Sequence, residues 1–328
     1  MPQPVALVTG ITGQTGGYLA EQLIAAGWTV HGLVRDADAA EADFVARTPE
    51  AVLHSGDLGD ADRTSAVIAE IAPDAVFNLG GVSSVAASWN DPVEAARVTG
   101  FGVAALLEAA WAVQESAGRR VAFVQASSAE LFGAATQVPQ NEDTPIRPVN
   151  PYGAAKAAAH HLVAVYRDRG LAASNGILFN HESPRRPPTF VTRKITQTVA
   201  RIAAGQADEL VLGNLDAVRD WGWAPDYARA LSLAATGEPG DYVIATGQAH
   251  SVRDFVEASF TAVGIDDWEP LVRQDAAFLR PADAPVLVGD ASKARRVLGW
   301  QPSVDFAGMV AAMTDADLEE ARNPASRT

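Results

Sequence analysis

Short apolar runs alternate with amphipathic stretches through the first 130 residues of the chain. Short apolar runs predict buried strands at 5–9, 28–34, 52–58, 74–81 and 121–128. Amphipathic stretches between them predict helices, among them 60–71 and a long one over 92–117. Strands that alternate with helices are typical of an α/β fold whose central sheet is parallel and doubly wound.

The same rhythm divides the chain into two parts. We expect residues 1–180 to form a Rossmann-type dinucleotide-binding domain, because they carry most of the predicted strands. Residues 181–328 should form a smaller α/β substrate-binding lobe. Within that part, residues 212–250 should partly return to the sheet, as the apolar run DYVIATG at 241–247 indicates.

A glycine-rich turn follows the first predicted strand. In GITGQTGGYLAEQLIAAG, three glycines are spaced three apart between a strand and an amphipathic helix. Such a turn lets the backbone approach a pyrophosphate, which the helix N-terminus then holds electrostatically. A glycine-rich turn without a ligand is the plain alternative, but the strand before it and the helix after it favour dinucleotide binding. The candidate cofactor contacts on this loop are Gly10, Thr12, Gly13, Gln14, Thr15 and Gly16.

Arg35 and Asp36 end the second predicted strand, where the adenosine ribose of a dinucleotide is recognised. Arginine suits the 2′-phosphate of NADP, whereas an acid suits the free 2′-hydroxyl of NAD. We favour NADP, with NAD as the alternative. Asp57, Leu58 and Gly80 are further candidate cofactor contacts, because ligands of such sheets bind beyond the carboxyl ends of the strands.

Tyr152 and Lys156 lie four residues apart in NPYGAAKAAAHHL, a spacing that puts both side chains on one face of a helix. An ammonium about 4 Å from a phenol stabilises the phenolate by roughly 4 kcal/mol, enough to bring the tyrosine pKa near 7. The pair could then take a proton from a substrate hydroxyl. The plain alternative is a surface aromatic beside a surface lysine.

Ser128 and Glu130 follow the fifth predicted strand and should reach the same edge of the sheet. A hydroxyl at Ser128 can hydrogen-bond the oxygen that Tyr152 deprotonates, and Glu130 can take a carbon-bound proton beside a carbonyl. A serine-rich turn and an acidic helix cap are the plain alternatives. Asn150 and Pro151 supply the N-cap and the first-turn proline that begin the tyrosine helix.

Composition narrows the classes of protein. With 328 residues, 48% of them hydrophobic, the chain can bury a sizeable core. A net charge of −15 opposes binding to nucleic acid or to an anionic membrane surface. The lack of cysteine excludes disulfides and thiolate chemistry, and we expect no metal site. No apolar run reaches the length of a membrane span and no signal-like segment opens the chain, so we expect a cytoplasmic protein.

The glycine loop, the strand-end serine and Tyr-x-x-x-Lys occur in the order that resembles the extended short-chain dehydrogenase/reductase family. Within that family, GILFNHESPRRPPTFVTRKITQTVARI at 176–202 and LGNLDAVRDWGWAPDYARAL at 212–231 resemble the signatures of the GDP-mannose 4,6-dehydratases. GITGQTGGYLAEQL near the N-terminus and RPADAPVLVGDASKARRVLGWQP at 280–302 are similar too. The resemblance therefore covers nearly the whole chain.

The resemblance implies a dehydration with internal hydride transfer. Tyr152, aided by Ser128 and Lys156, would take the proton of the 4-hydroxyl of GDP-mannose while hydride passes to NADP⁺. Glu130 would then take the proton at carbon 5, and water would leave from carbon 6. The hydride would return to carbon 6 to give GDP-4-keto-6-deoxymannose, so that the cofactor is regenerated and stays bound.

The resemblance also implies a basic pocket that holds the GDP group of the substrate in an acidic protein, with Glu182 near the sugar. The implied substrate contacts are Ser83, Asn180, Glu182, Arg185, Val191, Lys194, Arg219 and Arg280. Some arginines of this region should instead form salt bridges, and Arg186 and Arg193 are the weakest candidates for ligand contacts.

Three segments depart from the family pattern. Ala129 stands where dehydratases of this group carry a serine, which removes a candidate acid for the expulsion of water. The 36–50 segment is short and acidic where relatives have an arginine-rich stretch that reaches a neighbouring subunit, which argues against a tetramer. The resemblance instead implies a homodimer built from the alanine-rich tyrosine helix and the 92–117 helix, and the plain alternative is an alanine-rich helix buried within one chain. The 80–89 segment also diverges, which leaves sugar contacts by Ser83 and Ser84 open.

Two other functions fit parts of the sequence. A nucleotide-sugar epimerase or 4-keto reductase shares Tyr-x-x-x-Lys and often a glutamate at the same strand end. Ala129 favours that alternative, and NHESPRR opposes it. A nucleotide sensor without catalysis would keep NADP binding, but proteins of that kind typically lack the catalytic tyrosine.

Overall fold

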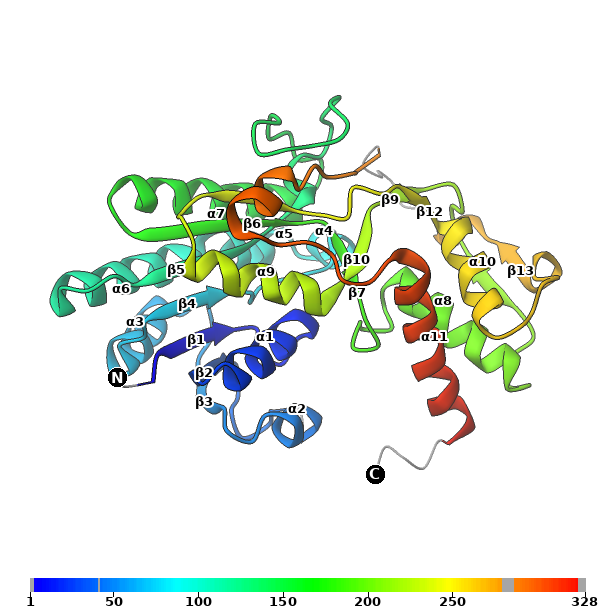
Figure 1. Cartoon of the computed structure of the whole chain (residues 1–328), viewed down its shortest axis with the longest axis horizontal. Coiled ribbons are helices and arrows are strands. Elements are labelled where there is room, and N and C mark those ends of the chain that lie inside the picture. Colours follow the sequence, from blue (N-terminus) through cyan, green and yellow to red (C-terminus); the bar gives the residue numbers. More distant parts are fainter. Residues whose placement is uncertain (1–2, 41, 279–285, 324–328) are drawn as a thin grey trace.

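A parallel sheet of seven strands forms the centre of the computed structural model, which describes residues 3–40, 42–278 and 286–323 (Figure 1). The strand order is β11-β6-β5-β4-β1-β2-β3, and every neighbouring pair is parallel. The prediction of a doubly wound α/β fold is therefore confirmed. The strands are β1 (Val5–Thr9), β2 (Thr29–Val34), β3 (Val52–Ser55), β4 (Ala75–Asn78), β5 (Ala122–Ser128), β6 (Ala172–Leu178) and β11 (Asp241–Ile244).

Helices cover both faces of this sheet because successive strand residues point to opposite sides. Leu7, Val76 and Phe123 pack on one face against α3 (Ala61–Ile71), α6 (Gly102–Ala117) and α7 (Pro151–Asp168). The next residues along the same strands, Val8, Phe77 and Val124, pack on the other face against α1 (Gln14–Ala25) and α9 (Ala224–Thr236). The continuous apolar runs in the sequence are thus strands buried on both faces.

The long helix predicted over 92–117 consists of three segments. Pro92–Glu94 (α5) leads into a π-helical stretch at Ala95–Phe101 (η1), and α6 continues from Gly102. The stretch has the length and mean hydropathy, 1.3, of a membrane span, yet half of it is buried inside the protein. It packs against α3 and α7, as the core helix of a sheet protein does.

A smaller lobe stands beside the sheet, to the right in Figure 1. Its core is formed by residues such as Ile195, Leu212 and Phe255 from α8 (Val191–Ala203), β8 (Leu210–Leu212) and α10 (Val252–Ala262), with α11 (Phe306–Arg322) against them. Two-stranded pairings complete it: β7 (Asn180–Glu182) with β10 (Trp221–Trp223), β9 (Val218–Arg219) with β12 (His250–Ser251), and β8 with β13 (Val272–Gln274). The remaining elements are α2 (Ala42–Arg47), α4 (Val85–Asn90), η2 (Ala129–Leu131), η3 (Glu269–Leu271), η4 (Ala276–Phe278) and η5 (Ala294–Leu298).

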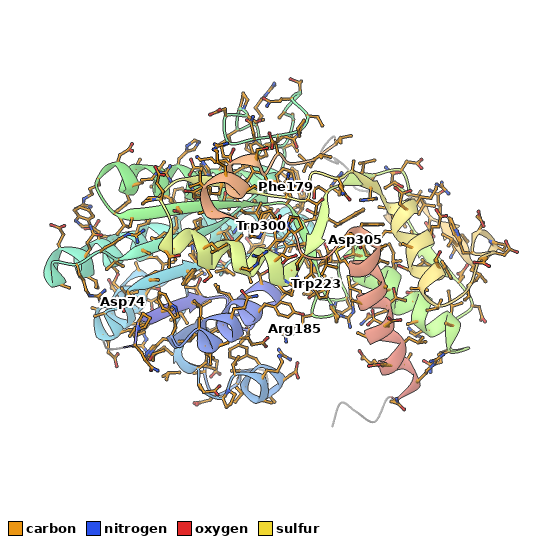
Figure 2. All side chains as sticks on the ribbon, in the orientation of Figure 1. Asp74, Phe179, Arg185, Trp223, Trp300 and Asp305 are labelled. Carbon is orange, nitrogen blue, oxygen red and sulfur yellow. The ribbon has the colours of Figure 1, made fainter. Side chains whose placement is uncertain are left out.

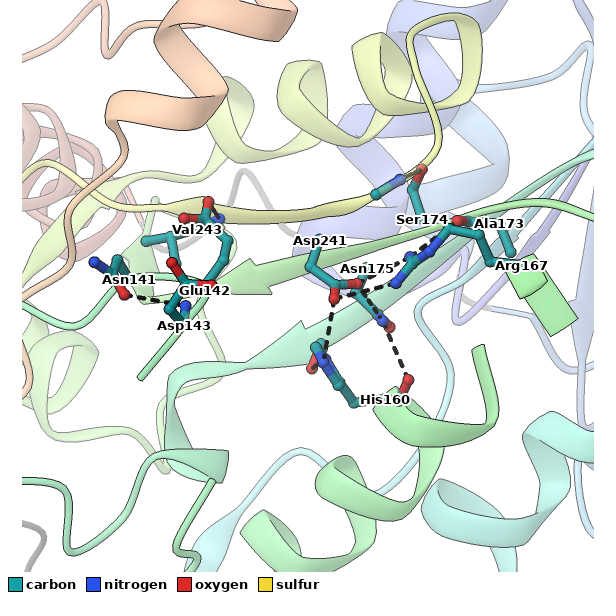
Figure 3. A network of polar contacts seen from close by, with 12 residues as sticks. Asn141, Glu142, Asp143, His160, Arg167, Ala173, Ser174, Asn175, Asp241 and Val243 are labelled. Atoms are coloured by element: carbon teal, nitrogen blue, oxygen red, sulfur yellow. Dashed lines mark hydrogen bonds and ion pairs between the residues drawn. The ribbon is translucent and has the colours of Figure 1, made fainter. Parts of the chain in front are cut away.

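A polar network fastens the last strand of the sheet to α7 (Figure 3). Asp241 on β11 accepts hydrogen bonds from Arg167 Nη1 at 3.0 Å and Asn175 Nδ2 at 2.8 Å, and His160 Nε2 lies 3.6 Å from its carboxylate. Ser127 Oγ lies 3.4 Å from His160 Nδ1, so this serine belongs to the network. Burial lowers the pKa of His160, which keeps the imidazole neutral near pH 7.

Asp220 joins three segments between the sheet and the lobe. One carboxylate oxygen accepts hydrogen bonds from the Thr246 amide at 2.9 Å and the Thr246 hydroxyl at 2.6 Å. The other accepts from the amides of Gly247 at 2.8 Å and Gly289 at 3.2 Å. A buried carboxylate with four donors is stable only while it can accept all of them.

Asp220→Asn should therefore lower the free energy of unfolding by about 2–4 kcal/mol, because one amide NH₂ group would face buried N–H donors. Asp216→Asn, in the turn before β9, is the control and should change it by less than about 0.5 kcal/mol, since Asp216 is exposed. Chemical denaturation of both variants measures the difference. Equal stabilities would contradict this role for Asp220.

Candidate active site

The end of β5 and the start of α7 meet at the carboxyl edge of the sheet. Ser128 ends β5, and its hydroxyl accepts a hydrogen bond from the Glu130 amide at 3.2 Å. The backbone of α7 lies directly against this turn, since a Cβ on Gly153 would come within 2.5 Å of Glu130 O. The Tyr152 amide donates to the Ser88 hydroxyl on α4 at 3.1 Å. Side chains from both segments therefore share one edge, as the sequence predicted.

Tyr152 and Lys156 occupy one face of α7, with Lys156 Nζ 5.8 Å from the centre of the Tyr152 ring. The Lys156 ammonium is buried and donates to the carbonyl oxygen of Ala126 on β5 at 2.7 Å. Burial lowers the pKa of Lys156 to about 8. The lysine therefore anchors α7 to β5 as well as facing the tyrosine.

The sequence predicted that Lys156 lowers the pKa of Tyr152. In this structure that prediction is wrong, because the pKa of Tyr152 is raised. Burial raises the pKa of the Tyr152 phenol, and the nearby Glu130 carboxylate raises it further. A hydrogen bond with the Ser128 side chain and the positive charge of Arg186 act in the opposite direction. Lys156 is not among the groups that shift the pKa of Tyr152, and its ammonium donates to Ala126 O.

Glu130 is half-buried next to the tyrosine. Its Oε2 accepts a hydrogen bond from Asn150 Nδ2 at 2.8 Å. Ala129, the residue before it, is 3% exposed and packs in the hydrophobic core. Position 129 therefore contributes a methyl group to the core and no proton donor.

The glycine turn fits a dinucleotide. Gly10 has φ +66°, and a Cβ on Gly16 would lie 2.2 Å from Gly10 O, so both positions require glycine. Gly13 is the exposed N-cap residue of α1, and no side chain of the described residues caps this helix. The backbone amides of its first turn can therefore donate hydrogen bonds to an anion. Thr12 is half-buried in the same loop.

Gln14 and Thr15 bind protein groups of the 180–186 segment, which crosses from β6 into the lobe. Gln14 Nε2 donates to His181 O at 2.9 Å, and Gln14 Oε1 accepts from Ser183 Oγ at 2.8 Å. Thr15 Oγ1 lies 2.8 Å from His181 Nε2. The side chains of Gln14 and Thr15 therefore connect the helix of the glycine turn to the segment that leads into the lobe.

Arg35 and Asp36 lie exposed at the end of β2. Asp36 Oδ1 accepts hydrogen bonds from the amides of Asp38 at 3.0 Å and Ala39 at 3.3 Å. One carboxylate oxygen of Asp36 is therefore used to shape the following loop.

Asp57, Leu58 and Gly80 gather at the ends of β3 and β4. Asp57 Oδ1 accepts from the Gly59 amide at 2.7 Å, and Arg97 Nη2 lies 3.4 Å from the same oxygen. A Cβ on Gly80 would come within 2.6 Å of the Leu58 side chain. The three predicted cofactor contacts beyond the glycine loop thus lie on the same edge of the sheet.

Glu182 and Arg185, both predicted to contact the substrate, have protein partners in this structure. Glu182 is 1% exposed, accepts from Thr192 Oγ1 at 2.8 Å and forms an ion pair with Arg186 at 3.1 Å. Burial raises the pKa of Glu182. Arg185 pairs with Glu21 on α1 at 2.9 Å and stacks on Tyr18 at 3.9 Å. Arg185 lies where the sheet meets the lobe (Figure 2), and its guanidinium joins the two.

The other predicted substrate contacts lie around the boundary of the lobe. Asn180 is half-buried in β7, Val191 begins α8, and Lys194 is half-buried one turn later. Arg219 is buried in β9 and donates to Val218 O at 2.7 Å. Ser83 is exposed in the loop after β4. Arg280 lies outside the described residues.

Arg186 and Arg193, the weakest predicted candidates for ligand contacts, both have acidic protein partners. Arg193 is buried and pairs with Asp317 on α11 at 2.6 Å, a salt bridge inside the lobe. Arg186 instead stacks on Phe190 and acts electrostatically on Tyr152 and His181, so it belongs to the site. No signal in the sequence separated the two arginines, because only their distant partners differ.

Sequence reasoning missed His181 at this site. Its ring stacks on Tyr227 with centroids 4.6 Å apart, and its Nδ1 lies 2.8 Å from Phe179 O. Burial lowers the pKa of His181 to about 4, so the ring is neutral near pH 7. The Nδ1 contact leaves Nε2 to accept from Thr15. Its place in NHESPRR, beside the predicted contacts, was the available signal.

Comparison with known proteins adds to this geometry. Residues 7–313 match the family model described as GDP-mannose 4,6 dehydratase. GDP-mannose 4,6 dehydratase 2 of Arabidopsis thaliana is 46% identical over 332 residues, which cover 98% of this chain and 88% of that protein. The Homo sapiens GDP-mannose 4,6 dehydratase is 43% identical over 353 residues, covering 98% and 94%. A solved UDP-glucose 4-epimerase of Thermus thermophilus, in complex with NAD, has a TM-score of 0.82 at 28% identity over 95% of this chain and 98% of that one.

Gly16→Ala should weaken cofactor retention by about tenfold or more, because the new methyl group cannot fit against Gly10 O without displacing the turn. Gly17→Ala is the matched control, since its Cβ would meet atoms only at 3.6 Å or beyond and alanine favours a helix. The nucleotide that stays bound through gel filtration gives the comparison. Equal retention by both variants would refute the assignment of the turn.

Proposed function

Because the chain belongs to the GDP-mannose 4,6-dehydratase family and is a lyase of that activity, we propose a residue-level route from GDP-mannose to GDP-4-keto-6-deoxymannose and water. The observation that carries it is the meeting of Ser128, Glu130, Tyr152 and Lys156 at one strand end, beside a glycine turn that fits a dinucleotide. A nicotinamide cofactor, when bound, accepts the hydride of carbon 4 and returns it to carbon 6.

Tyr152 is the base for the 4-hydroxyl in this proposal. Ser128 supports it, because their hydrogen bond already favours the phenolate. Arg186 adds positive charge nearby, in the same direction. Lys156 holds the tyrosine helix against β5 and supplies a second cation in its charged form. The phenolate of Tyr152 thus takes the hydroxyl proton as the 4-ketone forms.

Glu130 then takes the proton at carbon 5, which the 4-ketone has made acidic. The electron pair of that C–H bond forms the C5–C6 double bond while the C6–O bond breaks. Glu130 passes its proton to the departing oxygen, so water leaves. We assign Glu130 both roles because Ala129 has no proton to give. A proton must also reach carbon 5 to complete the product, and it balances the one that Tyr152 took from the 4-hydroxyl.

The proposed cofactor is NADP, held by the glycine turn and the ends of β2, β3 and β4. Support for the 2′-phosphate comes from Arg35, which is exposed, and from Asp36, whose Oδ1 is already used by two loop amides. An arginine can bind a phosphate with two parallel hydrogen bonds. The Thermus thermophilus relative contains NAD, which supports a nicotinamide cofactor in general.

The proposed substrate pocket lies between the sheet edge and the lobe. Its proposed contacts are Asn180, Val191, Lys194 and Arg219, together with Ser83 in the loop after β4. Arg280 keeps its place in the proposal through the resemblance. Cationic groups here offset the charge of −15 for a diphosphate ligand. We assign Arg185 the joining of lobe and cofactor helix, and Glu182 the support of Arg186.

The proposed assembly is a homodimer through α7 and the 92–117 stretch. Large apolar side chains on these elements are exposed: Val93 by 76%, Phe101 by 65% and Val165 by 61%. Apolar groups of this size gathered on a surface favour association. Within the 36–50 segment, Ala42–Arg47 form the short α2, and Arg47 pairs with Glu21 of the same chain. We therefore propose no tetramer. Cytoplasmic location stays a prediction from composition.

The purified enzyme should convert GDP-mannose to a 4-keto-6-deoxy product without added cofactor. Tyr152→Phe should lower kcat by about 10²–10⁴-fold with bound nucleotide unchanged, because only the base is lost. Ser128→Ala should lower it about tenfold or more, and the control Ser127→Ala, which contacts His160, less than about threefold. Mass spectrometry measures the product formed by the wild type and by each of the three variants. Turnover that needs added reduced cofactor would indicate a reductase instead.

Arg35→Ala should shift cofactor preference from NADP toward NAD by about 10- to 100-fold, the loss expected for one charge-assisted phosphate contact. Asp36→Asn is the control, because the amide keeps the Oδ1 acceptor for the loop and should leave NADP preferred. Enzyme equilibrated with equimolar NADP⁺ and NAD⁺ is freed of unbound nucleotide, and the bound forms are quantified. A wild-type preference for NAD would overturn the choice.

A further inference from the structure

Asn150 uses both ends of its side-chain amide at the start of α7. Its Oδ1 accepts a hydrogen bond from the Gly153 amide at 2.8 Å, which caps the helix that carries Tyr152 and Lys156. Its Nδ2 donates to Glu130 Oε2 at 2.8 Å. The residue is 8% exposed, so both bonds are shielded from water. One side chain thus connects the tyrosine helix with the carboxylate that follows β5.

The backbone and the carboxylate of Glu130 are held by different groups. The Glu130 amide donates to Ser128 Oγ, and the Glu130 carbonyl lies against Gly153. Across residues 3–40, 42–278 and 286–323, Asn150 is the side chain that hydrogen-bonds the Glu130 carboxylate. The direction of that carboxylate therefore depends on the amide of Asn150, since the backbone contacts leave its side-chain torsions free.

We propose that Asn150 is a positioning residue for the proton transfer at carbon 5. The inference rests on the proposed function, in which Glu130 takes that proton and passes it to the departing oxygen. An amide N–H can fix a carboxylate without giving it a proton, so Glu130 stays a base while its second oxygen faces the substrate. Because the same amide caps α7, it connects the Glu130 carboxylate directly to the helix that carries Tyr152.

The capping role and the positioning role can be separated by substitution. Serine caps helices about as well as asparagine but is too short to donate to Glu130, so Asn150→Ser removes only the second bond. Asn150→Ala removes both. We expect the unfolding midpoint of Asn150→Ser to match the wild type, its kcat to fall by about 10- to 100-fold and its KM to change less than about threefold.

A spectroscopic signature identifies the step that is slowed. If the carbon 5 transfer becomes limiting in Asn150→Ser, the first hydride transfer precedes it, so absorbance of reduced nucleotide at 340 nm should accumulate when GDP-mannose is mixed with holoenzyme. Deuterium at carbon 5 of the substrate should also give a larger primary isotope effect on kcat than in the wild type. A merely structural role would move neither quantity.

Three results would overturn the proposal. The first is a kcat for Asn150→Ser within about twofold of the wild type. The second is a loss of kcat in Asn150→Ala but not in Asn150→Ser. The role of Asn150 would then be limited to capping α7. The third is a lower kcat with neither accumulation at 340 nm nor an increased isotope effect. That result would indicate damage to the tyrosine step.

A second variant guards against a folding defect in the first. Asn150→Asp keeps the cap but puts a second carboxylate beside Glu130, so its kcat should fall at least as far as that of Asn150→Ser. A kcat at the wild-type level in this variant would contradict the proposal. Failure of the proposed function is distinguishable from all these outcomes, because the wild-type enzyme would then form no keto product.

Discussion

The docking of α7 on the end of β5 is the constraint on which the rest of the site depends. The Lys156 ammonium is bound to Ala126 O, Gly153 lies against Glu130 O, and Asn150 caps the helix while it holds the Glu130 carboxylate. A hydroxyl, a carboxylate, a phenol and an ammonium from two segments are thereby held at one strand end. A side chain at position 153 larger than hydrogen would separate them, since its Cβ would lie only 2.5 Å from a carbonyl oxygen.

Burial that fixes these groups also opposes their ionisation. It raises the pKa of Tyr152 and lowers that of Lys156 to about 8. The groups that favour the phenolate are Ser128, through a hydrogen bond, and Arg186, through its charge. Arg186 is itself kept in place by Glu182 and Phe190. Base strength at Tyr152 is therefore a property of the 180–186 segment as well as of α7.

The same segment joins the glycine turn to the lobe. Gln14 and Thr15 bind His181 and Ser183, and Arg185 binds Glu21 further along α1. Movement of the lobe would therefore pull on the helix whose N-terminus is proposed to hold the pyrophosphate.

The sequence alone determined what depends on local patterns: the alternation of strands and helices, the glycine turn, and the shared face of Tyr152 and Lys156. These follow from spacings of a few residues, which the backbone geometry of strands and helices converts directly into positions. The sequence could not assign partners. The sequence does not distinguish among three arginines of the lobe. In the structure Arg185 pairs with Glu21, Arg186 with Glu182 and Arg193 with Asp317. Asn150 read as a helix cap, and its bond to Glu130 spans 20 residues of chain. Only the tertiary structure decided these contacts, because charge and hydrogen bonding act through distance in space, which separation along the chain does not specify.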